Sequence, residues 1–323
     1  MNVHPERTAV VVGGGIAGLA SAWCLRQAGW TVRILERDEP RMIASNVAAA
    51  LWHPFAVGGG KTDEWALDTF VRLMEFARDP QSGVVVRQGL ELKRQPSPPP
   101  AWAAHHPDFR LARPDELPVD RPAGFVFSAP VAEMGLFLPW LRAQLQQLGV
   151  SCTTQTVTDL HALCNDTTVV VNCTGLGARQ LAGDASLVPW RGSVLRVERE
   201  ALETFTLDDD DPLRATYIIP RTSDCVLGGS VEPGIESLEP EDSTLTAIRA
   251  RCAARVPSVA HARLISTATH LRPWRPTVRL EAEDLGTGGR IVHNYGHGGA
   301  GVTLAFGCGA EVVRLASAVP VRC

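Results

Sequence analysis

Three segments of this chain contain residue types whose spacing could support chemistry. Near the C-terminus, Arg272-Pro-Trp-Arg-Pro-Thr-Val-Arg-Leu-Glu281 is followed, about a dozen residues later, by the glycine-rich segment His293–Thr303. Near the N-terminus, glycines recur in the pattern Gly13-x-Gly15-x-x-Gly18. Glycines alone are a weak signal, because a structural turn can have the same spacing. The two C-terminal segments turn a generic nucleotide-binding pattern into a candidate enzyme.

The N-terminal glycines have a mechanical interpretation. Gly13 permits a tight turn, Gly15 lets the backbone approach a pyrophosphate, and Gly18 lets a helix pack closely on a strand. The amides at the start of that helix would face the phosphates. A β-branched run precedes the motif, and Glu36 lies about 20 residues beyond it, placed to accept hydrogen bonds from ribose hydroxyls. These elements form a βαβ opening, and we predict that it binds a dinucleotide.

The glycines do not distinguish NAD from FAD, so the choice between the two cofactors depends on the other elements of the chain. The βαβ unit is interrupted by inserted sheet, and the last segment ends in a glycine-rich helix start, which favours a tightly held flavin. The acidic run Asp208–Asp211 and the proline-rich residues 95–122 are interpreted as solvated loop and surface connections. We predict helices near 16–27, 64–77, 131–148 and 299–316, and strands near 152–157, 168–173, 192–197, 216–219 and 225–229.

The expected fold is α/β with two domains. A Rossmann-like FAD-binding domain would comprise residues 1–75, 134–185 and 277–323. A discontinuous substrate-binding domain with a mixed or antiparallel sheet would comprise residues 76–133 and 186–276. The domains interleave along the chain because nucleotide-fold elements lie at both ends and in its middle.

Composition narrows the class of partner. The chain has 323 residues, of which 45% are hydrophobic and 20% charged, and its formal net charge is −4. Its 31 Lys and Arg residues are scattered, so we expect neither nucleic acid nor an anionic membrane as a partner. No apolar run approaches the roughly 18 residues of a membrane span, no secretion signal is recognised, and the cysteines form no CxxC pair. We therefore expect a cytoplasmic protein with reduced thiols and a small-molecule ligand.

Seven segments, in the family's order, resemble the D-amino-acid oxidase family, which includes D-aspartate oxidase, along nearly the whole chain. They are Val10–Gly18, Val47–Pro54, Val171–Gly175, Arg191-Gly192, Tyr217–Pro220 with Leu227–Gly229, Arg272–Pro276 and His293–Thr303. The last two are specific to the family, and the chain is identified as a bacterial-type member. The resemblance implies non-covalently bound FAD and oxidation of D-amino acids to 2-oxo acids, ammonia and hydrogen peroxide, by hydride transfer to flavin N5 and reoxidation by O2.

The resemblance also implies roles for individual residues. Arg272 matches the arginine that grips the substrate carboxylate, Tyr217 the tyrosine that adds a second hydrogen bond, and Gly299 the glycine whose carbonyl receives the amino group. His53 matches a position near the substrate, either at the pocket wall or as a hydrogen-bonded histidine. The implied FAD contacts are Gly13, Gly15, Ile16, Ala17, Gly18, Glu36, Arg37, Ser45, Asn46, Ala49, Ala50, Val157, Thr174, Gly175, Gly298, Gly299, Ala300, Gly301, Val302 and Thr303.

Two positions depart from the family pattern. Leu213 stands where vertebrate members have a tyrosine on a mobile lid, and Ala300 replaces another aromatic residue. Leu213 predicts a more open pocket with faster product release. Arg214 or Arg221 could reach an acidic substrate side chain, which would favour D-aspartate or D-glutamate.

The residues leave three different functions open. Covalent flavin attachment would favour a flavin amine oxidase of the glycine or sarcosine oxidase type, and Cys308 is the one cysteine near the flavin segment. The second is a D-aspartate-selective oxidase, and the third is a non-catalytic flavin-binding protein. We expect no metal site, because the glycines around His297 predict a loop, although His293 lies four residues away. The oligomeric state is open, a homo-oligomer being one outcome.

Overall fold

The N-terminal βαβ unit forms as the sequence predicts. Strand β1 (Thr8–Val12) ends in the glycine turn, α1 (Ile16–Gln27) follows at once, and β2 (Thr31–Glu36) pairs parallel to β1. The β-branched residues of β1 favour a strand. Gly29, with a φ of 83°, follows α1 in a conformation that suits glycine. The structure, a computed structural model, describes residues 7–37, 43–54, 61–165, 167–285 and 289–318.

Five parallel strands make the nucleotide-binding half of the sheet. Their order is β14 (Arg290–His297), β7 (Thr168–Asn172), β1, β2 and β6 (Ser151–Thr154). Because β1 and β7 run side by side and parallel, the turns that follow them open at the same edge of the sheet. Ligands bind at such a carboxyl edge in open α/β sheets.

The other half of the sheet is mainly antiparallel. It continues through β8, β11, β10 and β9 to β3, β5 and β4, with β12 beside β8 and only β3 and β9 pairing in parallel. Over the described residues the sheet has fourteen strands. The bounds in this half are β3 (Val84–Lys93), β4 (Arg110–Leu111), β5 (Ala123–Ala132), β8 (Val188–Glu198), β9 (Phe205–Asp208), β10 (Thr216–Pro220), β11 (Asp224–Gly228) and β12 (Glu232–Pro233).

One long strand joins the two halves. β13 (Leu264–Asp284) pairs with β8 from Leu264 to Trp274 and with β14 mainly from Arg279 to Asp284. Its register is irregular between Trp274 and Arg279. The predicted domain boundary between residues 276 and 277 falls inside this irregular stretch. The division into two domains stays a prediction, because a single sheet runs through both.

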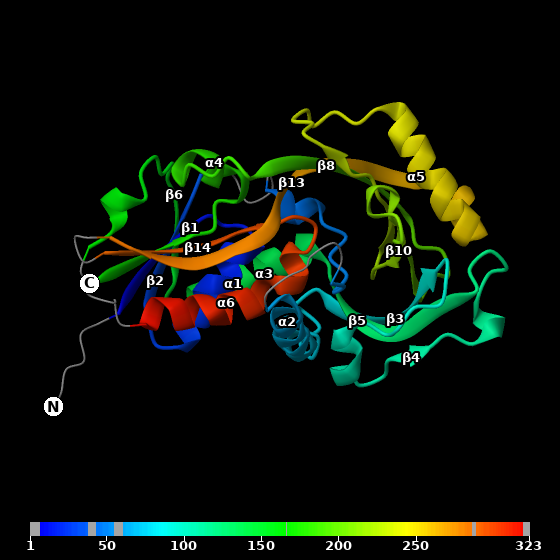
Figure 1. Cartoon of the computed structure of the whole chain (residues 1–323), viewed down its shortest axis with the longest axis horizontal. Coiled ribbons are helices and arrows are strands. Elements are labelled where there is room, and N and C mark those ends of the chain that lie inside the picture. The colour runs from blue at the N-terminus through cyan, green and yellow to red at the C-terminus, as the bar shows by residue number, and fades with distance from the viewer. Residues whose placement is uncertain (1–6, 38–42, 55–60, 166, 286–288, 319–323) are drawn as a thin grey trace.

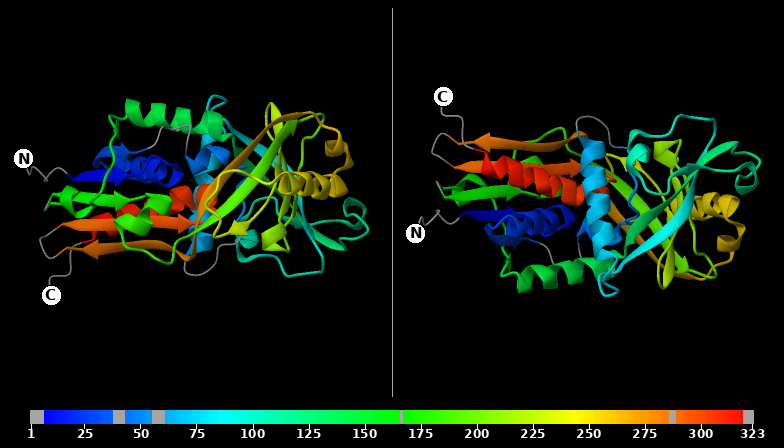
Figure 2. Two further views of the ribbon diagram at one scale, coloured as in Figure 1. Left: turned by 90° about the horizontal axis from the view of Figure 1, so that it is seen from above. Right: turned by 90° about the horizontal axis from the view of Figure 1, so that it is seen from below.

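Helices cover both halves of the sheet (Figures 1 and 2). α1, α3 (Met134–Gln147) and α6 (Gly301–Ser317) lie on one face of the parallel half, and α2 (Thr62–Phe76) lies where the halves meet. α5 (Asp242–Arg255) covers the outer face of the antiparallel half. Within the described residues, no helix is long and apolar enough to cross a membrane. The short helices are α4 (Ala178–Leu181), η2 (Ala44–Val47), η3 (Ala101–His105), η4 (Pro114–Glu116), η5 (His161–Leu163), η6 (Gly175–Gly177), η7 (Pro212–Arg214) and η8 (Pro257–Ala260).

Alternation along the antiparallel strands separates a core face from a cavity face. Ile218 of β10 packs with Ile248 and Cys252 of α5 in a buried cluster. Tyr217 and Ile219, on either side of Ile218, point to the opposite face and line a cavity. The packing of α5 therefore fixes the strand that presents Tyr217 to a ligand.

Several predicted elements differ from the structure. The strand predicted near 152–157 ends at Thr154, and the strand predicted near 192–197 already begins at Val188. The helix predicted near 131–148 begins at Met134, because the residues up to Ala132 extend β5. The sequence predicts a loop around His293 and His297, but both lie in β14. β14 pairs with β7 on one side and with β13 on the other, and these ladders outweigh the preference of the neighbouring glycines for turns.

Candidate active site

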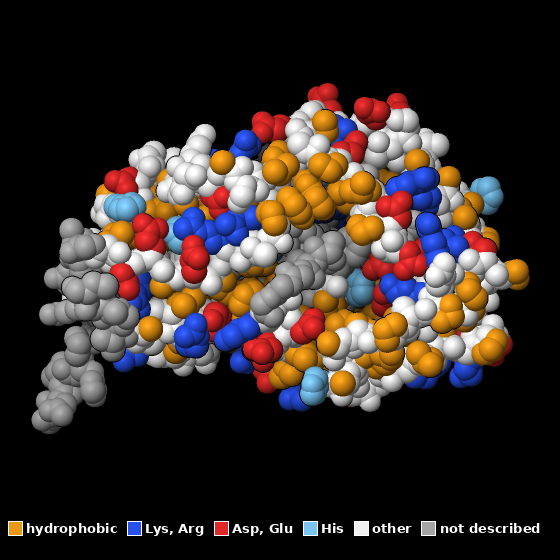
Figure 3. All heavy atoms as spheres, viewed as in Figure 1, with side chains coloured by type: hydrophobic (Ala, Val, Ile, Leu, Met, Phe, Trp, Pro, Cys, Tyr) orange, Lys and Arg blue, Asp and Glu red, His pale blue; other side chains and the backbone are white. Residues whose placement is uncertain are grey.

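One elongated cavity of about 720 Å³ connects the glycine turn with the antiparallel half of the sheet. Gly13, Gly15 and Glu36 line one end, and Tyr217 and Arg272 line the other. The short helix η2 and the start of α6 line the middle. A cavity of this size suits a ligand larger than one amino acid. On the described part of the face in Figure 3, positive and negative side chains are interspersed.

Close backbone contacts explain the spacing of the N-terminal glycines. A Cβ on Gly13, whose φ is 113°, would overlap the carbonyl that follows β7, and a Cβ on Gly18 would overlap the Gly13 carbonyl. These contacts are the tight turn and the close helix packing that the spacing predicts. α1 has no side-chain cap, and the Ile16 N–H donates to Ser45 Oγ at 3.1 Å. The amides at the start of α1 thus border the cavity, as an anion site requires.

Glu36 lies at the cavity end of β2, as the predicted ribose contact requires. Its side chain is nearly buried and accepts two hydrogen bonds from Arg142 of α3, at 2.9 and 2.8 Å. Arg142 also donates to the Gly14 carbonyl at 2.7 Å. The guanidinium ties β2 to the glycine turn and supplies the counter-charge of a buried carboxylate. Sequence reasoning missed Arg142, because it lies 106 residues from Glu36 and belongs to no motif.

The N-terminus of α6 faces the middle of the cavity. The helix begins at Gly301 without a side-chain cap, and Gly298 and Gly299 precede it on the cavity wall. Thr303 Oγ1 donates to the His53 carbonyl at 3.0 Å and accepts from the His53 N–H at 3.2 Å. This reciprocal pair holds the segment around His53 against the first turn of α6. The positive end of the helix dipole can therefore stabilise negative charge in the cavity.

A buried hydrogen-bond chain supports the strand that leads into α6. His297 Nε2 bonds Asn294 Oδ1 at 3.0 Å, and Asn294 Nδ2 donates to Ser21 Oγ at 2.9 Å. Ser21 Oγ in turn donates to the Ala17 carbonyl at 2.7 Å, so the chain has one direction and His297 Nε2 carries the hydrogen. Burial lowers the pKa of His297 to about 4. This imidazole on the cavity wall is therefore neutral at pH 7.

Arg272 and Tyr217 meet at the far end of the cavity. Arg272 Nη1 donates to the Ser230 carbonyl at 2.8 Å, and the guanidinium lies beside the Tyr217 hydroxyl. Burial raises the pKa of the Tyr217 hydroxyl, although the neighbouring guanidinium acts in the opposite direction. A Cβ at Gly192 would overlap Arg272, and a Cβ at Gly228 would overlap Tyr217. Both side chains thus lie over glycines of neighbouring strands and still face the cavity.

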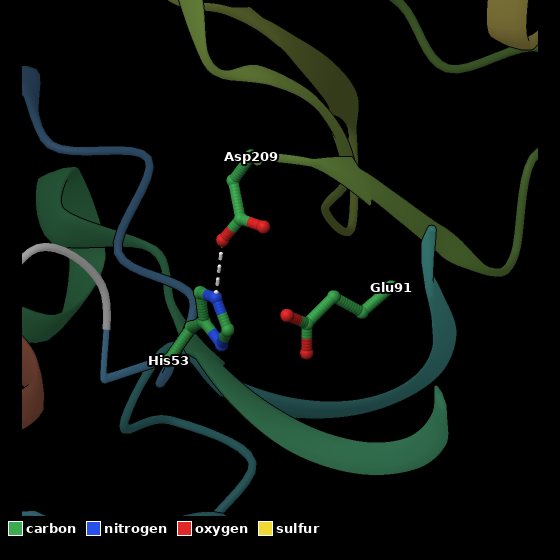
Figure 4. Close-up of side chains that lie close together, drawn as sticks. All are labelled: His53, Glu91 and Asp209. Carbon is green, nitrogen blue, oxygen red and sulfur yellow. Dashed lines mark hydrogen bonds and ion pairs between the residues drawn. The ribbon is translucent and has the colours of Figure 1, made fainter. Parts of the chain in front are cut away.

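A charged cluster of His53, Glu91, Lys93 and Asp209 lies beside this end of the cavity. Figure 4 shows three of its members, His53, Glu91 and Asp209. His53 Nε2 is 2.8 Å from Asp209 Oδ2, and the Glu91 carboxylate points toward the same imidazole. Lys93 Nζ lies 2.5 Å from Glu91 Oε1 and 3.1 Å from Asp209 Oδ1. Burial alone would lower the pKa of His53, but the charges of Glu91 and Asp209 raise it. Burial would raise the pKa of Asp209, but the bond from His53 and the charge of Lys93 hold it at about 2.

Two histidine-containing groups have ligand types that metals use. The ligand atoms of His53, Glu91 and Asp209 lie within 4.8 Å of one another. Lys93 is at hydrogen-bond distance from both carboxylates and already supplies the positive charge there, so we assign the cluster no metal. His293 and His297 are four residues apart on a strand, which separates them by about 13 Å and excludes a shared ion. The loop that the sequence predicts for them is wrong, and strand geometry is the physical reason why they cannot form one site.

Most of the predicted cofactor and substrate residues line this one cavity. On its wall are Gly13, Gly15, Ile16, Ala17, Glu36, Arg37, Ser45, Ala49, Ala50, His53, Val157, Thr174, Gly175, Tyr217, Arg272, Gly298, Gly299, Gly301, Val302 and Thr303. Three predicted FAD contacts are off the wall. Gly18 packs against the glycine turn, Asn46 lies in η2, and Ala300 is only 1% exposed in the core. Gly18 and Ala300 therefore lie in the layer of residues that packs behind the cavity wall and supports it.

The two arginines suggested for an acidic substrate side chain lie elsewhere. Arg221 is buried and donates twice to Asp224, at 2.6 and 2.7 Å. Arg214 and Leu213 are exposed in η7. The side chains of Arg214, Arg221 and Leu213 do not line the cavity. The structure gives no support to binding of an acidic side chain by Arg214 or Arg221. Faster product release because of Leu213 stays a prediction.

The acidic run Asp208–Asp211, which begins at the last residue of β9, is only in part the solvated loop that the sequence predicts, since Asp210 is exposed but Asp208 and Asp209 are not. Asp208 is buried and pairs with Arg121 at 2.9 Å and with Arg255 at 2.7 Å. Asp209 points the other way and lines the cavity. Leu207 is also on the cavity wall, and side chains two residues apart on a strand lie on the same face. This alternation is the sequence signal that could have placed Asp209 on the wall. Ser230 is a further wall residue without a sequence signal, because it contributes its backbone carbonyl.

The residues of this cavity fit FAD. The uncapped start of α1 suits a pyrophosphate, Glu36 suits a ribose, and the uncapped start of α6 suits the negative charge of a reduced flavin ring. No other group is needed to explain why two helix N-termini share one cavity with a guanidinium at its far end. The fold and the site together define a flavin-dependent oxidoreductase.

Known proteins agree with this class. The model of the family described as FAD dependent oxidoreductase matches residues 8–315. A D-amino-acid oxidase of Rubrobacter xylanophilus is 45% identical over 96% of both chains, and one of Streptomyces coelicolor is 39% identical over 95% of this chain and 96% of its own. The crystal structure of glycine oxidase from Geobacillus kaustophilus has the same fold, with a TM-score of 0.80 at 18% identity over 96% of this chain and 95% of its own. The chain belongs to the FAD dependent oxidoreductase family, and the predicted resemblance to the D-amino-acid oxidases is confirmed.

Proposed function

We propose that this chain is a D-amino-acid oxidase, which converts D-amino acids and O2 to 2-oxo acids, ammonia and hydrogen peroxide. The observation that carries the proposal is the position of Arg272 beside Tyr217 in the same cavity as the glycine turn and the start of α6. The relatives at 45% and 39% identity are named for this activity, which supports D-handedness. FAD, when bound, supplies the redox chemistry by accepting a hydride from the substrate Cα and passing the electrons to O2.

In this proposal Arg272 and Tyr217 form a clamp that binds the substrate carboxylate. The planar guanidinium can donate to both carboxylate oxygens, which fixes the orientation as well as the position of the substrate. Burial raises the pKa of Tyr217, so its hydroxyl keeps its hydrogen at neutral pH and can donate to the same carboxylate. The clamp leaves the substrate one orientation in the cavity, and this orientation lowers the barrier as a proximity effect.

The start of α6 would orient the other end of the substrate. Gly299 lies on the cavity wall just before α6, where its backbone carbonyl can accept a hydrogen bond from the substrate amino group. The amides and the positive dipole end of α6 favour negative charge nearby. No acid or base of the chain has to touch the reacting carbon. The contribution of the chain to catalysis is thus binding, orientation and electrostatics.

Non-covalent FAD is favoured over a covalently bound flavin. Cys308 is fully buried, lies off the cavity wall, and has a pKa raised well above its usual value, first by burial. Cys173 is on the wall, but burial raises its pKa to about 12. A thiol with so high a pKa is a poor nucleophile for a thioether bond. This argues against a flavin attached through a cysteine, and the structural likeness to glycine oxidase at 18% identity supports the fold alone.

A D-aspartate-selective oxidase and a non-catalytic flavin protein lack a supporting observation. Recognition of D-aspartate through Arg221 is opposed by the pairing of that residue with Asp224. A non-catalytic flavin protein would not need a carboxylate clamp, yet Arg272 and Tyr217 are both in place. O2 as electron acceptor, a cytoplasmic location and a homo-oligomer stay predictions.

An anaerobic substrate panel tests the proposed function. The purified protein is mixed without oxygen with the D- and L-isomers of alanine, leucine, lysine and glutamate, and the visible absorbance of the flavin is followed. We expect bleaching by D-isomers alone, with return of the yellow colour and formation of hydrogen peroxide when air is admitted. Bleaching by L-isomers alone, or a colourless protein that cannot be reconstituted with FAD, would overturn the proposal.

A further inference from the structure

Asp209 presents a carboxylate to the substrate end of the cavity. It follows β9 on the same face as Leu207, and both residues line the cavity. The Asp209 carboxylate is fixed by His53 Nε2 at 2.8 Å and Lys93 Nζ at 3.1 Å, and its side chain is 11% exposed. The clamp has no need of a second charged group. The position of Asp209 on the wall therefore calls for a role of its own.

The cluster around Asp209 is negative in either protonation state of His53. Three carboxylates, on Glu91, Asp209 and Asp210, surround the Lys93 ammonium within 3.4 Å. Protonated His53 would add one further positive charge, which still leaves the carboxylates in excess. Asp209 itself stays ionised at all ordinary pH values, because His53 and Lys93 hold its pKa at about 2 against the effect of burial. The wall thus favours a cation and opposes an anion.

The distance from the clamp to Asp209 matches a long side chain. Tyr217 of β10 extends over Gly228 of β11, and the sheet order continues from β11 through β10 to β9. Two strand spacings separate β11 from β9, which is about 9.5 Å. An extended lysine side chain places its ammonium about 6 Å from Cα, and a hydrogen bond at each end adds about 3 Å. A substrate held at the clamp can therefore reach Asp209 with a terminal cation.

The wall between the clamp and Asp209 is apolar. Leu207 lies directly opposite Tyr217 in the ladder between β9 and β10, and Ile219 lies two residues further along β10 on the same face. Both side chains line the cavity. An apolar stretch that ends in a carboxylate complements a methylene stem that ends in a positive charge.

We propose that Asp209 is a specificity-determining residue that selects D-amino acids with a cationic side chain, such as an amine or guanidinium, over those with an anionic one. This inference rests on the proposed oxidase function and names the substrate class of the same site. His53 and Lys93 act as positioning residues, because they hold the Asp209 carboxylate at 2.8 and 3.1 Å, and Lys93 lies off the cavity wall.

Pairs of substrates that differ in charge but little in shape test the inference. For the wild-type holoenzyme we expect kcat/KM to be about tenfold higher for D-lysine than for D-norleucine, and about tenfold lower for D-glutamate than for D-glutamine. Asp209→Asn should bring both ratios close to one. Asp210→Asn is the matched control, because it removes the same charge 3.4 Å from Lys93 but off the cavity wall, and both ratios should change less than about twofold.

Oxidation of D-alanine by the same preparations separates the two proposals. If D-alanine and all other D-amino acids fail to reduce the wild-type flavin, the oxidase function itself fails. If D-alanine is oxidised but D-lysine is no better than D-norleucine, or Asp209→Asn leaves both ratios unchanged, the role of Asp209 is wrong.

A measurement on the unmodified protein covers the case in which Asp209→Asn does not fold. 6-Aminohexanoate, hexanoate and adipate contain a carboxylate for the clamp but no α-amino group, so they bind without being oxidised. Their dissociation constants follow from perturbation of the flavin spectrum. We expect 6-aminohexanoate to bind about tenfold more tightly than hexanoate, and adipate more weakly. Equal binding of the three, or tightest binding of adipate, would contradict the inference.

Discussion

The guanidinium of Arg272 lies directly over the backbone of Gly192. The two residues belong to the neighbouring strands β13 and β8, and any Cβ at Gly192 would overlap the guanidinium. Arg272 is also fixed by its bond of 2.8 Å to the Ser230 carbonyl. The position of the proposed carboxylate clamp therefore depends on the absence of a side chain at Gly192, which itself lines the cavity.

Replacement of Gly192 by alanine should displace the clamp without disturbing the cofactor. We expect kcat/KM for D-alanine to fall by about 10²-fold, because a shift of about 1 Å in a positioning group has an effect of this size. FAD content, measured from the visible spectrum after gel filtration, should be unchanged. Gly135→Ala is the control, because nothing lies within 4 Å of a Cβ there, and its activity should be that of the wild type. Normal activity of Gly192→Ala would show that Arg272 need not lie where it does.

Removal of the Arg272 side chain should abolish most of the binding of substrate carboxylate. Arg272→Ala should remove about 3–5 kcal/mol of transition-state stabilisation, which is measured as a fall in kcat/KM. Losses of this size are seen for other charge pairs that are shielded from water. Arg272→Lys should recover only part of this loss, because an ammonium cannot bind both oxygens in one plane. Steady-state kinetics with D-alanine measure both. Arg275→Ala, which removes a guanidinium paired with Asp184 and off the wall, should leave kcat/KM within about twofold.

Arg142 should be needed for both stability and FAD binding. Arg142→Ala leaves the Glu36 carboxylate nearly buried without its guanidinium, and we expect the free energy of unfolding to fall by about 3–5 kcal/mol. The dissociation constant of FAD should rise about tenfold, since Glu36 and the Gly14 carbonyl lose a common partner. A double variant, Arg142→Leu with Glu36→Gln, should regain stability but not FAD affinity. Recovery of both would show that Glu36 has no role toward the cofactor.

Acid should destabilise the protein through His297 in a defined window. Its folded pKa of about 4 lies below its unfolded value near 6.5, so its contribution to stability is complete above pH 6.5 and is lost as pH falls towards 4. The loss is about 3 kcal/mol. The raised pKa of His53 acts in the opposite sense, and Asp209, with a pKa of about 2, loses its contribution only below pH 4.

Urea unfolding between pH 7 and pH 4.5 measures this effect. His106 and His293 also have lowered pKa values, first because of burial, and therefore add to the slope. His297→Asn separates them, because asparagine can donate to Asn294 but does not titrate. Its stability should depend less steeply on pH than that of the wild type. Equal slopes for the two proteins would show that His297 is not a buried neutral group.

The sequence was most informative where local signals determine structure. The strand, glycine turn and helix from Thr8 to Gln27 are predicted correctly, because β-branched residues, glycine spacing and helix-forming residues act within one short segment. The clamp residues Arg272 and Tyr217 lie in segments typical of the family, and they meet in the cavity as expected. The residues at the two ends of the cavity could therefore be predicted, one end from local sequence signals and the other from the family motifs.

The remaining parts of the site depend on contacts that no local pattern contains. Lys93 meets Asp209 across 116 residues, and Arg142 meets Glu36 across 106. The loop predicted at His293 is wrong because two neighbouring strands extend β14 through residues whose own preferences favour a turn. Side chains alternate between the two faces of β9, and only the assembled sheet determines which face borders the cavity. It therefore also determines that Asp209, and not Asp208, reaches the cavity.

β13 makes the two ends of the cavity mechanically inseparable. Its 21 residues pair with β8 beside the clamp and with β14 beside the start of α6. Because one continuous strand takes part in both ladders, we expect the distance between the two ends of the cavity to be set when the chain folds. A cut near residue 276 would leave an unpaired strand edge on each fragment, and such edges aggregate. Chimeras that exchange substrate preference with a relative must therefore carry the whole strand.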